Sequence, residues 1–135
     1  MALQVDVVSP ERVTYSGQAE MVICRTVGGG DIAFQAGHVP FVGILQVWEA
    51  KVVGTDTDET FAVHSGFVQV ARDQVTILSD VSEHRDDIDV ERAQAARERA
   101  QAALEADGAD SEAGAAAQRA AVRLAVAAGT SPIDH

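Results

Sequence analysis

The residues of this sequence best suited to binding chemistry are charged side chains at helical spacing. In DDIDVERAQAARER, which spans residues 86–99, Asp89, Arg92 and Arg99 fall on one stripe if the segment is a helix, because positions three, four and seven apart stack along a helix face. Arginine makes paired hydrogen bonds to phosphate and carboxylate groups. The stripe is therefore a candidate site for an anion.

Two further arginines, Arg119 and Arg123, lie four residues apart and share a face of a second helical segment. If the two segments form an antiparallel hairpin, four guanidinium groups converge, and these would repel one another unless an anion or carboxylates joined them. The alternative is surface ion pairing, in which Arg92 or Arg85 takes up Asp89 for at most about 1 kcal/mol per pair. Spacing alone favours ion pairing, since solvated charges are the usual case.

Catalytic and metal-binding patterns have little support. The glycine-rich VGGGDIAF is not followed by Gly-Lys-Ser/Thr, and the only lysine is Lys51, so a phosphate-binding loop is rejected. Ser65 lies beside His64, and neighbours in a strand point to opposite faces, which argues against a nucleophile and base. No pair has helical metal-ligand spacing among the four histidines, His38, His64, His84 and His135. We therefore expect no catalytic residue, no metal and no required cofactor.

The charge of the chain limits its partners. The 135 residues carry a formal net charge of -11, with 10 basic residues against 21 acidic ones. Phosphate backbones require many Lys and Arg contacts, so no nucleic acid is expected as a partner. An anionic membrane surface is disfavoured by the same repulsion. The acidity suits solubility or a basic protein partner.

Two further features bear on the compartment. Cys24 is the only cysteine and lies in the alternating run AEMVICRTV, where a small apolar thiol packs in a core; a reactive thiol is the weaker alternative. A chain without an internal disulfide fits a reducing compartment. No signal peptide is expected, and no run approaches the roughly 20 apolar residues of a membrane-spanning helix. Any membrane association is expected to come through a partner.

Residues 1–84 are expected to form a β-domain. Apolar residues alternate in LQVDVV and AEMVICRTV, and FVGILQVWEAKVV, FAVHSGFVQVA and QVTILSD follow with turn signals between them. Several short strands of this kind predict an antiparallel sandwich or a flattened barrel. No helix-length segment separates them, which argues against a parallel-sheet topology.

Residues 85–135 are expected to form two helices. Ala, Arg, Glu and Gln replace the β-branched residues there. Asp86 or Asp87 is the expected cap of the first helix, and Asp110 or Ser111 that of a second helix running to about residue 128. Both helices are rich in alanine, which buries little area. We therefore expect a mobile hairpin that docks on the β-domain, detaches, or lies along a partner.

Four stretches, in this order and spacing, resemble the epsilon subunit of the bacterial rotary proton-translocating ATP synthase along nearly the whole chain: VVSPERVTYSGQAEMV, GGGDIAFQAGHVPFVGIL, FAVHSGFVQVARDQVTILSD and IDVERAQAARERA. The resemblance implies an amino-terminal ten-stranded β-sandwich followed by a two-helix antiparallel hairpin. It also implies a non-catalytic subunit at the foot of the central rotor stalk, where the sandwich binds the gamma subunit and touches the ring of c subunits.

On that resemblance, the loop from Asp31 to His38 faces the rotor partners. The family usually has Gly where Ala33 stands and Leu-Pro where Gln35 and Ala36 stand, so we expect the contacts of this loop with the ring to differ in detail. The residues predicted for the partner interface are Asp31, Gln35 and His38.

The resemblance also implies that the hairpin regulates the enzyme. Folded against the sandwich, it permits turnover; extended along gamma into the catalytic alpha/beta head, it blocks rotation and inhibits ATP hydrolysis. Some bacterial members bind ATP on the folded hairpin through a motif of Ile or Leu, Asp, two variable residues, Arg and Ala. The matching candidates for a regulatory ATP site in this sequence are Glu83, Ile88, Asp89, Arg92, Ala93, Arg99, Arg119 and Arg123.

Two functions from different classes follow. The first is a rotor subunit that couples proton translocation through the c ring to ATP synthesis via gamma, as a peripheral protein at the cytoplasmic face of the bacterial plasma membrane. The second is a free-standing adaptor whose acidic β-sandwich binds another protein. Recovery of gamma in a pull-down from membranes would distinguish the two.

Overall fold

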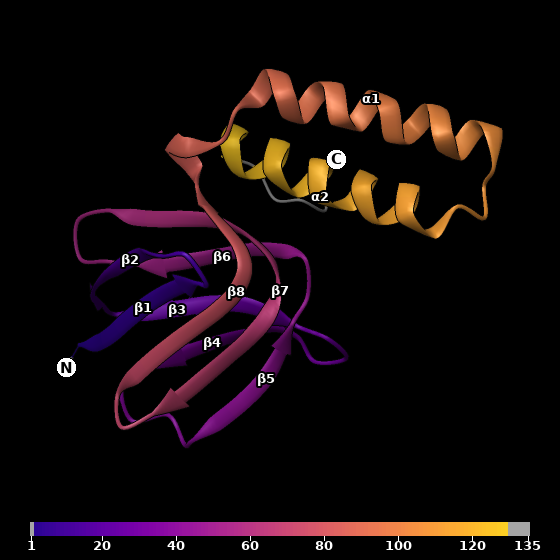
Figure 1. The fold of residues 1–135 in the computed structure, drawn as a ribbon. Coiled ribbons are helices and arrows are strands. Elements are labelled where there is room, and N and C mark those ends of the chain that lie inside the picture. The colour runs from indigo at the N-terminus through magenta and orange to yellow at the C-terminus, as the bar shows by residue number, and fades with distance from the viewer. Residues whose placement is uncertain (1, 130–135) are drawn as a thin grey trace.

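The computed structural model describes residues 2–129 and shows a β-sandwich with a helical hairpin at one end (Figure 1). In this part of the chain the strands are β1 (Leu3–Ser9), β2 (Arg12–Ala19), β3 (Met21–Thr26), β4 (Gly30–Gln35), β5 (Phe41–Leu45), β6 (Trp48–Val53), β7 (Asp58–Ala71) and β8 (Gln74–His84). A short 3-10 turn, η1 (Arg85–Asp87), leads to α1 (Val90–Ala106) and α2 (Ser111–Ala128). The predicted sandwich followed by a two-helix hairpin is confirmed. Residues 130–135, the end of the predicted hairpin domain, lie outside the described residues.

Alternating apolar residues build the interior of the sandwich. In β1, Leu3, Val5 and Val7 are fully buried, and the residues between them are more exposed. Side chains of this kind suit a pleated surface with one face covered, because successive residues point to opposite faces. The same alternation in the other strands completes a single core that includes Phe34 and Phe61.

Among the described strands one pair is parallel, a pairing that the predicted antiparallel sandwich did not include. β1 and β8 run parallel from Gln4 opposite Gln74 to Val8 opposite Leu78. The prediction missed this pair because it assumed that parallel strands need a connecting helix. They need only a long connection. Here the connection from β1 to β8 is the rest of the sandwich, β2 to β7, so no helix is required.

β7 and β8 bend and pass from one layer of the sandwich to the other. In β7 the core side chains fall on odd-numbered residues up to Val63 and on even-numbered residues from Val68. Ser65 and Gly66, with φ of 58° and 130°, lie where the pattern changes. A Cβ on Gly66 would lie 1.9 Å from the carbonyl oxygen of Leu78, so glycine is required there. Residues 2–129 form eight strands, and not the ten implied by the family resemblance, because β7 and β8 each run unbroken through both layers.

Aspartates cap both helices. Asp89 is the N-cap of α1, and its Oδ1 accepts a hydrogen bond at 3.0 Å from the backbone N–H three residues later. The predicted caps Asp86 and Asp87 fall in η1 instead, where the Asp86 N–H donates to His84 Nδ1. That prediction was wrong because the two residues after η1 are extended, so α1 begins only at residue 90. Of the two predicted caps of α2, Asp110 is the N-cap and Ser111 is the first helical residue.

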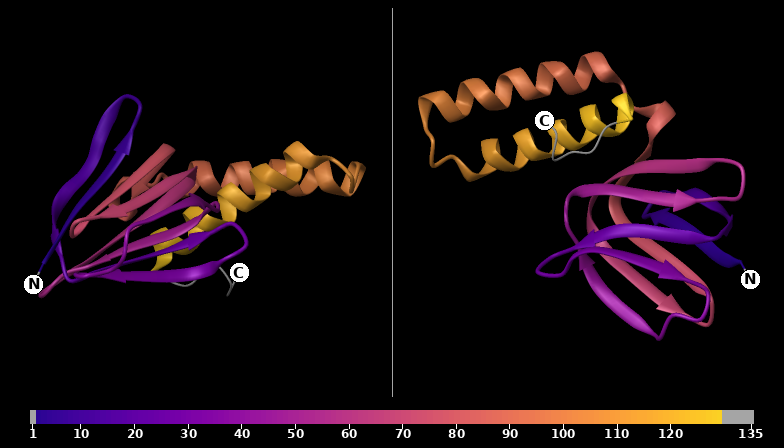
Figure 2. Two further views of the ribbon diagram at one scale, coloured as in Figure 1. Left: turned by 90° about the horizontal axis from the view of Figure 1, so that it is seen from below. Right: turned by 180° about the vertical axis from the view of Figure 1, so that it is seen from behind.

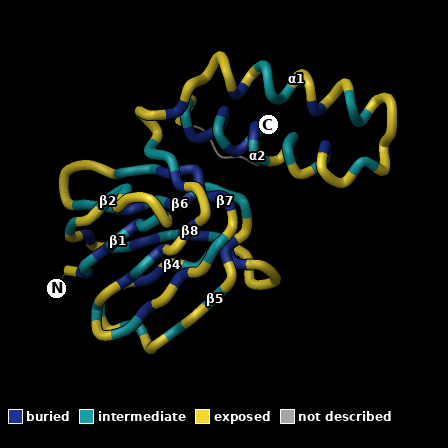
Figure 3. Tube along the Cα trace, viewed as in Figure 1, coloured by how far each residue is buried: buried dark blue, intermediate teal, exposed yellow. Residues whose placement is uncertain are grey.

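The hairpin is docked on the sandwich through α2, with α1 on the outer side (Figures 1 and 2). Residues 61–64 of β7 are all buried, because the sandwich core covers one face of the strand and the hairpin covers the other. Buried positions on α2 follow the side turned to the sandwich and to α1 (Figure 3). The docking cluster is small: Ala62, Ile88, Val122 and Val126, edged by Val47, Trp48 and Ala127.

Candidate functional site

A cavity of about 330 Å³ lies at the foot of the hairpin, between β8, the linker and both helices. Its volume falls within the range of small-molecule sites, roughly 300–1,000 Å³. Three carboxylates and three guanidinium groups supply its polar lining. We call this cavity the hairpin site, and its lining residues are Glu83, Asp87, Asp89, Arg92, Ala93, Ala96, Arg99 and Arg123.

Helix α1 supplies one wall of the hairpin site. Arg92 and Arg99 lie seven residues apart on the stripe predicted from their spacing, and both line the cavity. Between them, Ala93 and Ala96 leave room because alanine has no side chain beyond Cβ. The amino-terminal turn of α1 borders the same space, and its partial positive charge adds to that of the arginines. This wall is therefore suited to an anionic group.

The opposite wall is held by an ionic contact between the sandwich and the hairpin. Glu83 Oε1 on β8 accepts hydrogen bonds from Arg123 Nε on α2 at 2.6 Å and from His64 Nε2 on β7 at 3.1 Å. The His64 hydrogen bond and the nearby Arg123 charge lower the pKa of Glu83 to about 2, against the opposing effect of burial. His64 is 5% exposed, and its Nδ1 is buried without a hydrogen-bond partner.

The structure places the predicted ATP-site residues in three groups. Six line the hairpin site: Glu83, Asp89, Arg92, Ala93, Arg99 and Arg123. Ile88 is buried in the docking cluster. Arg119 is not among the lining residues, and its Nη2 donates to Glu112 Oε1 at 2.9 Å. This is a surface ion pair other than the Asp89 pairing weighed as the alternative. Asp87 and Ala96 also line the site but were not predicted; Ala96, four residues after Arg92, follows from the helical stripe once the arginines are chosen.

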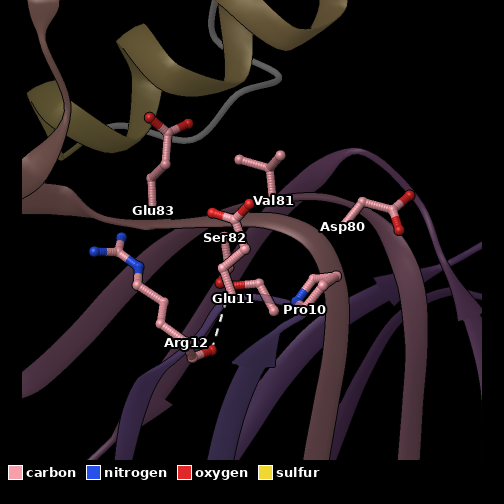
Figure 4. A pocket seen from close by; sticks show the side chains of 8 residues that line it. Pro10, Glu11, Arg12, Asp80, Val81, Ser82 and Glu83 are labelled. Atoms are coloured by element: carbon pink, nitrogen blue, oxygen red, sulfur yellow. Dashed lines mark hydrogen bonds between the residues drawn. The ribbon is translucent and has the colours of Figure 1, made fainter.

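A second cavity, of about 460 Å³, lies along β8 on the outside of the sandwich (Figure 4). In Figure 4, Glu83 lies beneath the hairpin and Asp80 lies farther along the same strand. With Glu11, these carboxylates outnumber the one lining arginine, Arg12, so this cavity repels anions. The hairpin site is therefore the better candidate for an anionic ligand.

The predicted partner-interface residues are spread along an edge strand and the turn after it. The segment expected to be a loop forms β4 from Gly30 to Gln35. Of the described strands, only β3 pairs with it. Asp31 lies at its start and Gln35 at its end, both exposed. His38 lies in the following turn, with its ring 4.9 Å from that of Phe34. The three residues therefore do not gather on one compact loop.

The turn that carries His38 is fixed to a second turn of the sandwich. The backbone N–H of Gly37 donates to Asp73 Oδ1 at 2.7 Å, and Asp73 lies in the β7–β8 turn. β8 begins at this turn and ends at the hairpin, so the two turns form the tip of the sandwich opposite the hairpin. Val39, 70% exposed, lies beside His38 at this tip.

Apolar side chains are exposed in a row across β5, β7 and β8. Ile44 pairs across the strands with Phe67, which pairs with Leu78. The row borders a groove of about 340 Å³ that Pro10 also lines. Exposed apolar patches of this kind mark interaction surfaces, although the sequence analysis did not single this one out. We call it the outer apolar row; it consists of Val42, Ile44, Phe67 and Leu78, which are 69%, 58%, 51% and 44% exposed.

Cys24, Ser65 and His64, the side chains weighed as reactive groups, lie in surroundings that suit packing and hydrogen bonding. Cys24 is 1% exposed in the sandwich core, and burial raises the pKa of its thiol to about 12, which confirms the predicted core role. Ser65 Oγ donates to Asp80 Oδ2 at 2.9 Å, whereas His64 points to Glu83. Among residues 2–129, no three His, Cys, Asp or Glu side chains are grouped so as to hold a metal ion.

Comparison with known protein families gives a match over all eight described strands of the sandwich. The family model described as ATP synthase, Delta/Epsilon chain, beta-sandwich domain matches residues 2–85. An ATP synthase epsilon chain of Brevibacillus brevis is 46% identical over 95 residues, which cover 70% of this chain and 71% of that protein. An ATP synthase epsilon chain of Streptomyces griseus is 38% identical over 95 residues, covering 70% and 76% of the two chains.

Two solved structures share the fold, one of them over nearly the whole chain. A chain in the cryo-EM structure of the Euglena gracilis mitochondrial ATP synthase, OSCP/F1/c-ring, superposes with a TM-score of 0.69 and covers 98% of this chain and 79% of that one. A chain from the central stalk and c ring of the Tetrahymena thermophila mitochondrial ATP synthase has a TM-score of 0.53 and covers 65% of this chain and 70% of that one. Their identities of 18% and 14% show a shared fold alone.

Proposed function

The chain belongs to the ATP synthase epsilon chain family, and from this membership we propose how its surfaces serve the rotor of that enzyme. Its role is that of a central-stalk subunit, which couples proton translocation through the c ring to ATP synthesis via gamma. A coupling subunit must hold two partners at once. The sandwich is suited to this because one stiff core connects its outer face with its tip.

The outer apolar row is our proposed contact with gamma, and it is the observation that carries the proposal. Four large apolar side chains on adjacent strands are exposed in the isolated chain. At about 25 cal/mol per Å², covering them would contribute several kcal/mol to association. The neighbouring groove beside Pro10 offers space for a side chain of the partner.

The tip of the sandwich and the edge strand β4 are our proposed contact with the c ring. His38 and Val39 lie at the tip, opposite the hairpin, and Gln35 lies at the adjoining end of β4. Asp31 adds a carboxylate at the far end of the same strand. Because Asp31 and His38 lie at opposite ends of β4, we propose that the ring contacts the strand along its length.

The hairpin site is our proposed site for a regulatory nucleotide such as ATP. Arg92 and Arg99 would hold phosphate groups, and Asp87 or Asp89 would accept hydrogen bonds from an amino group of the base. Such a ligand contacts both helices and β8 only when the hairpin is docked. It would therefore favour the docked form in proportion to its differential affinity for that form.

We further propose that the chain is non-catalytic and reaches the membrane only through the complex, on the cytoplasmic face of a bacterial plasma membrane. Ser65 and His64 point to different partners, which does not suit a nucleophile and base. Neither described helix combines the length and hydropathy needed to cross a bilayer. The extended hairpin would contact the alpha/beta head.

Capture of gamma tests the rotor proposal against the adaptor alternative. The affinity-tagged chain is incubated with detergent-solubilised bacterial membranes, and the bound proteins are identified by mass spectrometry. The rotor proposal predicts that gamma is recovered with wild-type protein and is lost with Phe67→Asp. Recovery of a different protein without gamma would support the acidic adaptor and overturn the rotor proposal.

A further inference from the structure

Arg25 lies between the proposed ring-facing strand and the docked hairpin. Arg25 on β3 is the ladder partner of Asp31 on β4. Its guanidinium group donates to both carboxylate oxygens of Asp31, from Nε at 2.9 Å and from Nη2 at 3.2 Å. A paired contact of this kind fixes the plane of the guanidinium group as well as its position.

The same guanidinium group covers the ring of Trp48. Arg25 Cζ lies 3.9 Å from the ring centroid, which is the geometry of a cation–π contact. The backbone holds the two residues together, since the Gln46 N–H donates to the Arg25 carbonyl oxygen at 2.9 Å. Trp48 is therefore fixed by a side chain that is itself fixed by Asp31.

Trp48 in turn supports the docked hairpin. It packs at the edge of the docking cluster formed by Ala62, Ile88, Val122 and Val126. Its neighbour Val47 accepts a hydrogen bond from Gln118 Nε2 of α2 through its carbonyl oxygen, at 3.5 Å. A continuous series of contacts thus leads from Asp31 through Arg25 and Trp48 to α2.

We propose that Arg25 is a positioning residue that makes docking of the hairpin depend on what engages Asp31. The proposal deepens the proposed function and rests on it for the identity of the partner at Asp31. A cationic group of that partner competes with Arg25 for the carboxylate, and Arg25 then no longer holds Trp48 in place. Since coupling between two sites is reciprocal, undocking the hairpin changes the affinity at Asp31 by the same factor.

Amide hydrogen exchange of the full chain tests this coupling without any partner present. Exchange of the α2 amides reports docking, and exchange of the β1 amides reports the sandwich core. The variants are Arg25→Ala, Arg25→Lys, Asp31→Asn and the double variant Arg25→Ala/Asp31→Asn. Arg12→Ala, which removes an exposed arginine on β2, is the matched control. Trp48 is the only tryptophan of the chain, so its emission gives a second reading of the same contact.

Arg25→Ala is expected to speed α2 exchange by about fivefold, the effect of one partly desolvated cation–π contact. Asp31→Asn should give a smaller increase, and the double variant should match Arg25→Ala alone, because Asp31 acts through Arg25. Arg25→Lys should fall close to Arg25→Ala, since lysine lacks the flat guanidinium group. In all four variants, exchange of the β1 amides should match wild type. In the Arg12→Ala control, exchange of both the α2 and the β1 amides should match wild type.

Two results would overturn the coupling. One is α2 exchange in Arg25→Ala and Arg25→Lys that equals wild type. The other is an effect of Asp31→Asn that adds in full to that of Arg25→Ala. A rise of β1 exchange in Arg25→Ala would mean that this variant disturbs the sandwich core. The effect of Asp31→Asn on α2 exchange is then tested in the Arg25→Lys background, by comparing Arg25→Lys with Arg25→Lys/Asp31→Asn. Capture of gamma is a separate measurement. A chain that shows the coupling but does not recover gamma would overturn the rotor proposal and leave the coupling in place.

Discussion

Arg123 on α2 donates to the same oxygen of Glu83 that accepts from His64, so one carboxylate joins the hairpin to the sandwich. Arg123 also lines the hairpin site. An anionic ligand there would contact the Nη groups of Arg123 while Nε donates to Glu83. The contact that holds the docked hairpin and the contact proposed for the ligand therefore share a side chain, which ties ligand binding to hairpin position.

Acid should weaken the docked hairpin through Glu83. The folded structure lowers the pKa of this carboxyl from 4.5 to about 2, so its stabilising contribution is complete above pH 4.5 and is lost as pH falls towards 2. Glu83→Gln is expected to cost about 1–3 kcal/mol of stability at neutral pH. The difference from wild type should shrink as pH falls from 5 to 2.5, measured by denaturant unfolding at each pH.

Glu98→Gln is the matched control for this pH series, because Glu98 is an exposed glutamate on α1. Its stability should stay within about 0.5 kcal/mol of wild type throughout. A Glu83→Gln deficit that is the same at pH 2.5 as at pH 7 would show that the charge of Glu83 does not hold the hairpin.

Nucleotide binding should depend on the arginines that face the hairpin site. Calorimetric titration with ATP is expected to give measurable heat with wild-type protein and a loss of affinity of about tenfold or more with Arg92→Ala, since a charge-assisted hydrogen bond contributes roughly 1.5–3 kcal/mol. Arg97→Ala is the control, because Arg97 lies on the same helix but is not among the lining residues. Identical heats for wild type and Arg92→Ala would show that ATP does not bind at the hairpin site.

Local patterns in the sequence predict the elements but not how they meet. Alternation predicts β1, and the Asp110 cap and the Arg92–Arg99 stripe follow from helical geometry, because each depends on residues within a few positions of one another. The pairing of Glu83 with Arg123 spans 40 residues and depends on the angle at which α2 docks. Periodicity carries no information on that angle.

The features that the sequence analysis missed also depend on how distant segments meet in the fold. The parallel pair of β1 and β8 joins the two ends of the sandwich, which no local pattern relates. Arg119 shares a helix face with Arg123 but turns to Glu112, because a surface charge takes the nearest partner. The outer apolar row alternates as core strands do, and only the fold shows that its residues face outward.

Two glycines should respond oppositely to alanine. Gly66 has φ of 130°, and a Cβ there would lie 1.9 Å from the Leu78 carbonyl oxygen, so Gly66→Ala is expected to cost about 3 kcal/mol or more. Gly114 lies within α2, where a Cβ meets nothing within 4 Å. Gly114→Ala should therefore stabilise the chain by about 0.5–1 kcal/mol. Thermal unfolding of both variants checks the pair, and a Gly66→Ala protein as stable as wild type would contradict the bend described for β7.

The central claim is that the chain couples the c ring to gamma through the outer apolar row. Its most direct test is ATP-driven proton pumping in bacterial membrane vesicles that have been stripped of their epsilon chain and supplied with this one. Wild-type protein should restore pumping, and so should Val13→Asp, which alters an exposed valine on β2. Phe67→Asp should fail to restore pumping, although amide hydrogen exchange should show that this variant is folded. Full restoration by Phe67→Asp, or none by the wild-type chain, would contradict the account.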